Sequence, residues 1–181
     1  MTYPLPATWP CAGQGTIRLW LNADDVFTPE RIQRIRKADY LSVMWPLQTE
    51  GAPNHPSPCS VRFQIDVAKR TLRLDAHVYG VGLSADVTRL VEPGKWFNVV
   101  LQWGPESGNR TEFVLLVDGK PVATKVDSRR PDSPGILLRM GVPGNGGQPW
   151  VGAMDELEAW NGRLEAEALA QPHPAGKRAK E

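Results

Sequence analysis

The sequence predicts an all-β fold, in which antiparallel strands form a sandwich of two sheets. Several segments alternate apolar and polar residues with a period of two, as strands do when one face is buried and the other meets water. The chain contains 17 Gly and 17 Pro, which gather in clusters such as VEPGK and GVPGNGGQP between these segments. Such clusters favour short turns. The 181 residues suffice for one domain with a substantial core.

Eight segments show the strand pattern. In chain order they are GTIRLWLNA, SVRFQIDVA, TLRLDAHVY, KWFNVVLQW, FVLLV, PVATK, GILLRMG and VGAMDELEAW. The connection between the second and third segments, Ala68-Lys69-Arg70, is short, which predicts a hairpin. Asp118-Gly119 suits a two-residue type I′ turn, because Gly adopts a positive φ freely and Asp tolerates it. We therefore expect Phe113–Val117 and Pro121–Lys125 to pair as a second hairpin.

One short helix is predicted, at about residues 28–39. Thr28 is a suitable N-cap and Pro29 suits the first helical position. Ile32 and Ile35 are spaced for one apolar stripe, and the remaining face is basic. This basic face either meets solvent or docks on an acidic partner or a phosphate; its residues are Arg31, Arg34, Arg36 and Lys37.

Charge and hydropathy restrict the classes of partner. The formal net charge of +1 gives no overall attraction to nucleic acid or to an anionic membrane. No apolar run approaches the ~18 residues that a membrane-spanning helix needs, so no membrane insertion is expected. The segment MTYPLPATWPCAGQG lacks the basic and apolar regions of a signal peptide. Whether Cys11 and Cys59 form a disulfide stays open at this point.

The second half of the chain resembles a known family. KWFNVVLQW, FVLLVDGKPVA, ILLRMG and WVGAMDELEAWNGRLEAEAL follow one another as they do in the laminin-G-like jelly rolls of the concanavalin A-like lectin/glucanase superfamily. The resemblance implies a jelly-roll domain at 15–169, which leaves an N-terminal arm at 1–14. The composition of AQPHPAGKRAKE predicts a flexible tail at 170–181. The family's first strand is hard to see before Gly15, and the helix resembles an insertion.

The resemblance raises catalysis, because glucanases of this superfamily carry a Glu-x-Asp-x-Glu strand. The nearest match is DELE, where a period of two places Glu156 and Glu158 on one face and Asp155 on the other. Only two of three carboxylates are present, and the three histidines are scattered. We therefore expect no enzyme activity, with a glycoside hydrolase as the least favoured alternative.

Metal and glycan sites are the remaining candidates. The resemblance implies no required cofactor, or one structural calcium ion with Asp155 as a ligand; Asp24 and Asp25 follow an early strand. A glycan site needs an exposed aromatic group beside hydrogen-bonding side chains. The alternation places most of the candidates on the polar face of adjacent strands, and they are Trp45, Arg62, Gln64, Arg73, His77 and Tyr79. The alternative for this set is an ordinary solvated sheet face.

The functional expectation is non-catalytic recognition of a glycan or a protein surface. The alternative is a structural virion protein, such as a phage capsid decoration or tail component, which would self-associate through apolar patches near Trp9, Trp20 or the helix. The first interpretation predicts an extracellular location within a longer exported protein, and the second predicts a place in the virion.

Overall fold

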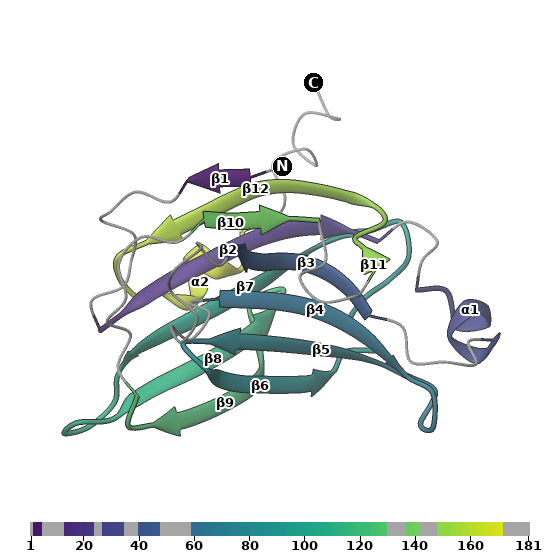
Figure 1. The fold of residues 1–181 in the computed structure, drawn as a ribbon. Helices are drawn as coiled ribbons and strands as arrows, with labels where there is room; N and C mark the ends of the chain where they lie inside the picture. The colour runs from purple at the N-terminus through teal and green to yellow at the C-terminus, as the bar shows by residue number, and fades with distance from the viewer. Residues whose placement is uncertain are drawn as a thin grey trace.

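Two antiparallel sheets lie face to face in the computed structural model (Figure 1). The structure describes residues 2–4, 13–23, 27–34, 40–47, 59–129, 137–141 and 148–171. The seven-stranded sheet has the spatial order β1 (Thr2–Pro4), β10 (Leu137–Met140), β3 (Tyr40–Leu47), β4 (Cys59–Asp66), β5 (Thr71–Val78) and β6 (Val81–Asp86), with β11 (Gln148–Pro149) parallel to β3. The five-stranded sheet has the order β12 (Ala153–Trp160), β2 (Gly15–Asn22), β7 (Trp96–Pro105), β8 (Thr111–Val117) and β9 (Lys120–Asp127). The predicted all-β sandwich is confirmed.

All eight predicted strand segments are strands, and the structure adds four more. β3 has the sequence YLSVMWPL, whose nearly continuous apolar run hides the alternation. β6 is short, and β11 has only two residues. β1 pairs with β10, so the segment expected to be an N-terminal arm contributes a strand to the seven-stranded sheet.

The core lies between the sheets and is filled by the apolar face of each strand. Phe63 of β4 sits at its centre, with ring centroids 5.2 Å from Phe27, 6.0 Å from Phe97 and 5.5 Å from Trp150. Tilted and edge-to-face contacts at such distances stabilise aromatic clusters beyond the area they bury. Cys59 is also buried in this core, and Cys11 lies outside the described residues, so their pairing is not addressed.

The two local signals in the sequence form as predicted. Asp118 and Gly119 have φ angles of 48° and 72°, and they connect β8 to β9. The helix α1 (Pro29–Arg34) starts where Thr28 Oγ1 accepts a hydrogen bond of 3.2 Å from the backbone N–H of Arg31. The predicted continuation of this helix through residues 35–39 lies outside the described residues. No helix in the described part of the chain is long and apolar enough to cross a membrane.

The C-terminal segment 161–171 covers part of the outer face of the five-stranded sheet. Its helix α2 (Ala166–Leu169) buries Leu169 in a small cluster against the sheet, together with Val100, Val114 and Leu116. Side chains of the sheet hold its backbone: Gln102 Nε2 donates to the carbonyl oxygen of Leu164 at 2.9 Å. Arg18 Nη1 donates to that of Ala168, also at 2.9 Å. This face of the sandwich is therefore occupied by the chain itself.

Candidate functional site

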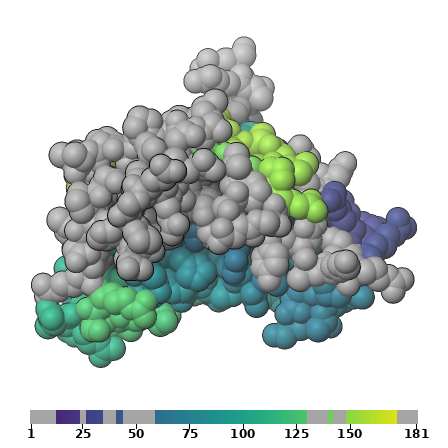
Figure 2. Space-filling view, in the orientation of Figure 1, coloured from purple at the N-terminus to yellow at the C-terminus, as the bar shows by residue number. Residues whose placement is uncertain are grey.

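The outer face of β4, β5 and β6 carries a row of polar side chains, which we call the polar face. Successive residues of a strand point to opposite sides, so the residues between the core positions all project outward. The polar face comprises Ser60, Arg62, Gln64, Asp66, Thr71, Arg73, Asp75, His77, Gly82, Ser84 and Asp86. Figure 2 shows β4 to β6, in blue and teal, reaching the molecular surface in the lower half of the view.

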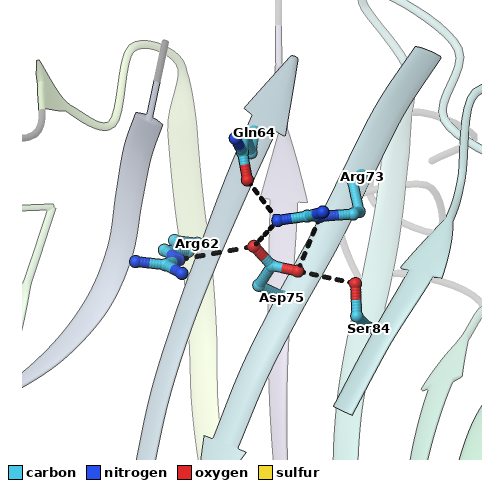
Figure 3. A network of polar contacts seen from close by, with 5 residues as sticks. All are labelled: Arg62, Gln64, Arg73, Asp75 and Ser84. Atoms are coloured by element: carbon cyan, nitrogen blue, oxygen red, sulfur yellow. Dashed lines mark hydrogen bonds and ion pairs between the residues drawn. The ribbon is translucent and has the colours of Figure 1, made fainter. Parts of the chain in front are cut away.

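Asp75 is the centre of the polar face (Figure 3). Its side chain is only 5% exposed, and its carboxylate accepts hydrogen bonds from Ser84 Oγ at 2.7 Å and from Arg73 Nη2 at 3.1 Å. Arg73 Nε lies 2.9 Å from the same carboxylate, and Arg62 Nε approaches it at 3.4 Å. Arg73 Nη2 also donates to the side-chain oxygen of Gln64. Three strands thus meet in one charge-assisted network.

The cross-strand register explains why these side chains meet. Asp75 stands directly opposite Arg62 on β4 and opposite Ser84 on β6, while Arg73 stands opposite Gln64. Side chains that face each other across antiparallel strands are close enough to interact. The network holds both guanidinium groups in fixed positions, while the side chains of Arg62 and Arg73 remain 31% and 40% exposed. Within the described part of the chain, Arg73 Nη1 has no partner.

His77 extends the polar face at one end of β5. It stands opposite Gly82, and a Cβ atom placed on Gly82 would lie 3.3 Å from His77 Nε2. Partial burial lowers the pKa of His77 below its usual value, the positive charge of Arg62 lowers it further, and the negative charge of Asp75 opposes both. The imidazole is therefore neutral at pH 7, with one nitrogen as donor and the other as acceptor. None of the described residues hydrogen-bonds either nitrogen.

A pocket of about 530 Å³ lies at the other end of β5, lined by Thr71, Asp86, Thr88, Arg89 and Leu90. Asp86 Oδ1 accepts hydrogen bonds from the backbone N–H and the hydroxyl of Thr88, at 3.0 Å and 2.6 Å. The hydroxyl bond is the main reason why the pKa of Asp86 is lowered. Asp86 stands opposite Arg73 in the sheet, so the pocket is continuous with the polar face.

Four of the six predicted glycan-binding residues come together on the polar face: Arg62, Gln64, Arg73 and His77. The prediction that Tyr79 faces outward is wrong. β5 ends at Val78, and Tyr79 enters the following turn with a φ of 48°. This change of direction buries its ring in the core, where it packs edge-on against Trp103 at 6.0 Å.

Trp45 lies in β3 opposite Arg139, and its side chain lies outside what the structure describes, so its part in binding stays a prediction. Sequence reasoning missed Asp75 and Ser84 as members of the site. The alternation had placed Asp75 outward, but it gave no sign that two arginines would converge on it. On the side of β3, the polar face is not accessible to solvent, because Ser42 of β3 and Ser60 of β4 are buried. The accessible part of the face lies over the rest of β4 and over β5 and β6.

The carboxylates of β12 are arranged differently from the prediction. Asp155 pairs with Trp20 and Glu158 pairs with Arg18, so Glu156 and Leu157 together oppose the single residue between them on β2. This is a β-bulge, in which Glu156 has a φ of 45°. It places Asp155 and Glu158 on the same face, whereas the alternation had paired Glu156 with Glu158. Glu158 accepts a hydrogen bond of 2.7 Å from Arg18 Nε, in an ion pair.

The calcium expectation finds no ligand set in the described residues. Asp155 is exposed, and its Oδ1 accepts a hydrogen bond of 2.9 Å from the N–H of Glu156. Within the described ranges, no group of three or more His, Cys, Asp or Glu side chains could hold a metal ion. Asp24 and Asp25 lie outside these ranges, so calcium binding stays a prediction.

The predicted docking helix is described only in part. Arg31 and Arg34 are exposed on α1, whose Ile32 is buried, as the apolar stripe predicted. Arg36 and Lys37 lie outside the described residues. Docking of this helix on an acidic partner stays a prediction.

Solved structures with the same fold include proteins that recognise carbohydrates and enzymes that cleave them. A candidate carbohydrate-binding protein from Bacteroides ovatus superposes with a TM-score of 0.56 and 17% identity, over 93% of this chain and 42% of that one. The binding domain of botulinum neurotoxin DC, in complex with SialylT, gives a TM-score of 0.51 and 11% identity, over 88% and 35% of the two chains. A sialidase from Trypanosoma rangeli gives 0.50 and 18%, over 87% and 22%.

The chain thus spans less than half of each of these three structures, and identities at this level establish the fold alone. No curated protein matches the sequence. A family model described as the concanavalin A-like lectin/glucanases superfamily matches residues 3–170, which is nearly the whole chain. This match confirms the resemblance of the sequence, and the chain belongs to the concanavalin A-like lectin/glucanase superfamily.

Proposed function

We propose that this protein is a non-catalytic glycan-binding module and that the polar face over β4 to β6 is its binding surface. The observation that carries the proposal is the fixation of Arg62 and Arg73 by one buried carboxylate, which leaves both guanidinium groups partly exposed. Donors that are already immobilised lose little conformational entropy when a ligand binds. Hydrogen bonds from charged donors are also stronger than neutral ones.

The groups on this face match the chemistry of sugars. Hydroxyl groups both donate and accept hydrogen bonds, so they need both kinds of partner. The neutral His77 offers a donor and an acceptor, the exposed Ser84 offers a hydroxyl, and Arg73 Nη1 offers a donor. Gly82 has no side chain beside the imidazole, which leaves room for a ligand to reach it.

Other features of the sandwich favour the polar face as the binding surface over the outer face of the five-stranded sheet. On the five-stranded sheet, Leu164, Leu169 and the backbone of the C-terminal segment cover the outer face over β2, β7 and β8. Among the described residues, Val151 is the exposed large apolar side chain, at 47%, and it forms no patch that would favour self-assembly or docking in a virion. The carbohydrate-binding protein and toxin domain with the same fold also support glycan recognition.

The carboxylates of the polar face support binding without cleavage. Asp75 is buried and surrounded by donors, so its oxygens are not accessible to a glycosidic bond. Asp66 is partly exposed, and its Oδ1 accepts hydrogen bonds from the N–H groups of Ala68 and Lys69. Asp86 is exposed, and its Oδ1 is engaged by Thr88. Glycoside hydrolysis needs two carboxyl groups on opposite sides of the scissile bond, one of them a proton donor. The pKa of Asp86 is lowered, chiefly by the hydrogen bond from the Thr88 hydroxyl, which disfavours this carboxyl group as the proton donor.

A glycan array followed by titration calorimetry tests the proposal. The labelled chain is expected to bind one class of glycan without releasing products. Arg73→Ala should weaken that binding by about tenfold or more, because it removes a charge-assisted donor. Gly82→Val adds a side chain beside His77 without removing a polar group, and should weaken it similarly. Arg110→Ala, an exposed arginine in the turn between β7 and β8, is the control and should have no effect.

Two results would overturn the proposal. One is an array without signal from a folded chain. The other is binding that survives both Arg73→Ala and Gly82→Val, which would place the glycan site elsewhere. Release of shortened products from the bound glycan would instead identify an enzyme.

A further inference from the structure

We propose that the ligand of the polar face is an anionic oligosaccharide, whose carboxylate or sulfate groups contact Arg62 and Arg73. The inference rests on the proposed function and narrows it to one class of glycan. It follows from the layering of charge at this face, where the carboxylate of Asp75 lies beneath the more exposed guanidinium groups of Arg62 and Arg73.

The first step concerns this layering. The carboxylate of Asp75 is 5% exposed, while the side chains of Arg62 and Arg73 are 31% and 40% exposed. Two positive charges share the one negative charge of Asp75, so this cluster of three side chains keeps one positive charge in excess. The other carboxylates of the polar face, Asp66 and Asp86, lie at its far end, where Oδ1 of each accepts hydrogen bonds from its own turn. Over Arg62 and Arg73, the charge that a ligand meets first is therefore positive.

The second step concerns the pocket at the other end of β5. The Oδ1 atom of Asp86 is engaged by the N–H and hydroxyl of Thr88, and Arg89 is exposed at the rim. Both Arg89 and Lys69 act on Asp86 electrostatically. This end of the row thus combines the exposed guanidinium of Arg89 with a carboxylate of which one oxygen is engaged.

The third step concerns length. β5 rises about 3.3 Å per residue, so the row from Thr71 in the pocket to His77 is about 20 Å long. That length suits several linked sugar units better than a single one. An extended chain lying along β5 would meet Arg89, the Arg62–Arg73 pair and His77 in turn.

The fourth step concerns the absence of a stacking platform in the described part of this face. Neutral glycans are commonly held by an exposed aromatic ring, and Tyr79, which follows β5, is buried in the core. Tyr40 of β3 stands opposite Gln64, and its side chain lies outside what the structure describes. The outward residues of β4, β5 and β6 include no Phe, Tyr or Trp. Ionic and polar contacts are therefore the main interactions that the described residues offer. Guanidinium groups bind carboxylates and sulfates through paired hydrogen bonds.

The test is an array of matched glycan pairs, probed with the whole chain. Each acidic oligosaccharide is printed beside its neutral counterpart: oligogalacturonate beside its methyl ester, and sulfated chains beside the desulfated chains. We expect binding to members with charge and at least a tenfold loss on neutralisation. The carboxylate and sulfate series separate the two sources of negative charge. Equal binding to neutral members would overturn this inference and leave the proposed function standing, whereas an empty array would overturn both.

Charge variants provide the second readout. Arg73→Gln should weaken binding to the acidic glycan by about tenfold, and Arg73→Lys should weaken it less, because it keeps the charge but loses the planar donors. Raising the salt concentration from 50 to 500 mM should weaken binding of the unmodified chain more than that of Arg73→Gln. Lys125→Gln on β9 is the control. Binding that needs added calcium, is lost in a chelator and survives Arg73→Gln would overturn the inference.

Discussion

Removal of the Asp75 carboxylate should destabilise this protein far more than removal of an exposed carboxylate that also forms an ion pair. Asp75 is 5% exposed and holds Ser84 at 2.7 Å, Arg73 at 2.9 Å and Arg62 at 3.4 Å. The variant Asp75→Ala leaves two neighbouring guanidinium groups without their shared anion. It also leaves a void beneath them on a sheet face whose neighbouring strands are fixed by backbone hydrogen bonds.

The size of the effect follows from burial. Loss of one partner from a fully buried ion pair costs about 3–5 kcal/mol. Because the side chains of Arg62 and Arg73 are 31% and 40% exposed, water can solvate them after the change, which reduces the cost. We therefore expect the free energy of unfolding to fall by about 2–3 kcal/mol in Asp75→Ala. Asp75→Asn keeps the shape and the acceptor for Ser84, so it should lose less.

Urea unfolding followed by tryptophan fluorescence measures this difference. For a slope of about 2 kcal/mol per molar urea, the midpoint should fall by about 1–1.5 M in Asp75→Ala. The matched control is Glu92→Ala, whose ion pair with Lys95 is exposed on both sides, at 63% and 69%. This control should change the free energy of unfolding by less than about 0.5 kcal/mol. Equal shifts in the two variants would show that the network around Asp75 does not stabilise the sheet.

Three other changes test separate parts of the structure. Gly152→Ala should lower the free energy of unfolding by about 2 kcal/mol or more, because a Cβ there would lie 2.1 Å from the carbonyl oxygen of Asn22. The control Gly94→Ala has open space around the new Cβ at a φ of 72° and should cost about 1 kcal/mol. Equal urea midpoints for the two variants would contradict this prediction. His77 has a lowered pKa in the folded protein, so the unfolded chain binds its proton first as the pH falls below about 6.5. Stability should therefore decrease between pH 7.5 and 5, and His77→Gln should make the melting temperature less dependent on pH in this range; an unchanged dependence would refute the assignment. Asp118→Asn should unfold at a urea concentration equal to or higher than that of the unmodified chain at pH 7, because burial raises the pKa of Asp118 and so disfavours its charged form. Asn keeps an acceptor for the N–H of Asn98, which donates to Oδ1 at 2.8 Å, and Asn-Gly suits the turn. A loss of stability as large as that of Asp118→Ala would contradict this prediction.

Most of the fold could be predicted because its signals are local. The alternation in SVRFQIDVA and TLRLDAHVY places Phe63 and Leu74 in the core and Arg62 and Arg73 outside, and the structure confirms both faces. The Asp118-Gly119 turn depends only on its own two φ angles. Thr28 caps α1 through a contact three residues along the chain. In each case, the residues that decide the conformation are neighbours in the sequence.

The departures arise where the conformation depends on partners distant in sequence. Tyr79 follows the outward positions of β5 by parity, but the strand ends one residue earlier and the turn sends its ring against Trp103. The bulge at Glu156 depends on the register between β12 and β2, which no local pattern in DELE reveals.

The candidate site shows the same division between sequence and tertiary structure. The sequence by itself determined that Arg62, Gln64, Arg73 and His77 share one face of a hairpin. Only the tertiary structure decided that Asp75 lies beneath the arginines, because its burial depends on a third strand, β6, and on side chains that converge across the sheet. Alternation fixes the side of the sheet on which a residue lies, whereas its depth and its partners follow from the register of neighbouring strands.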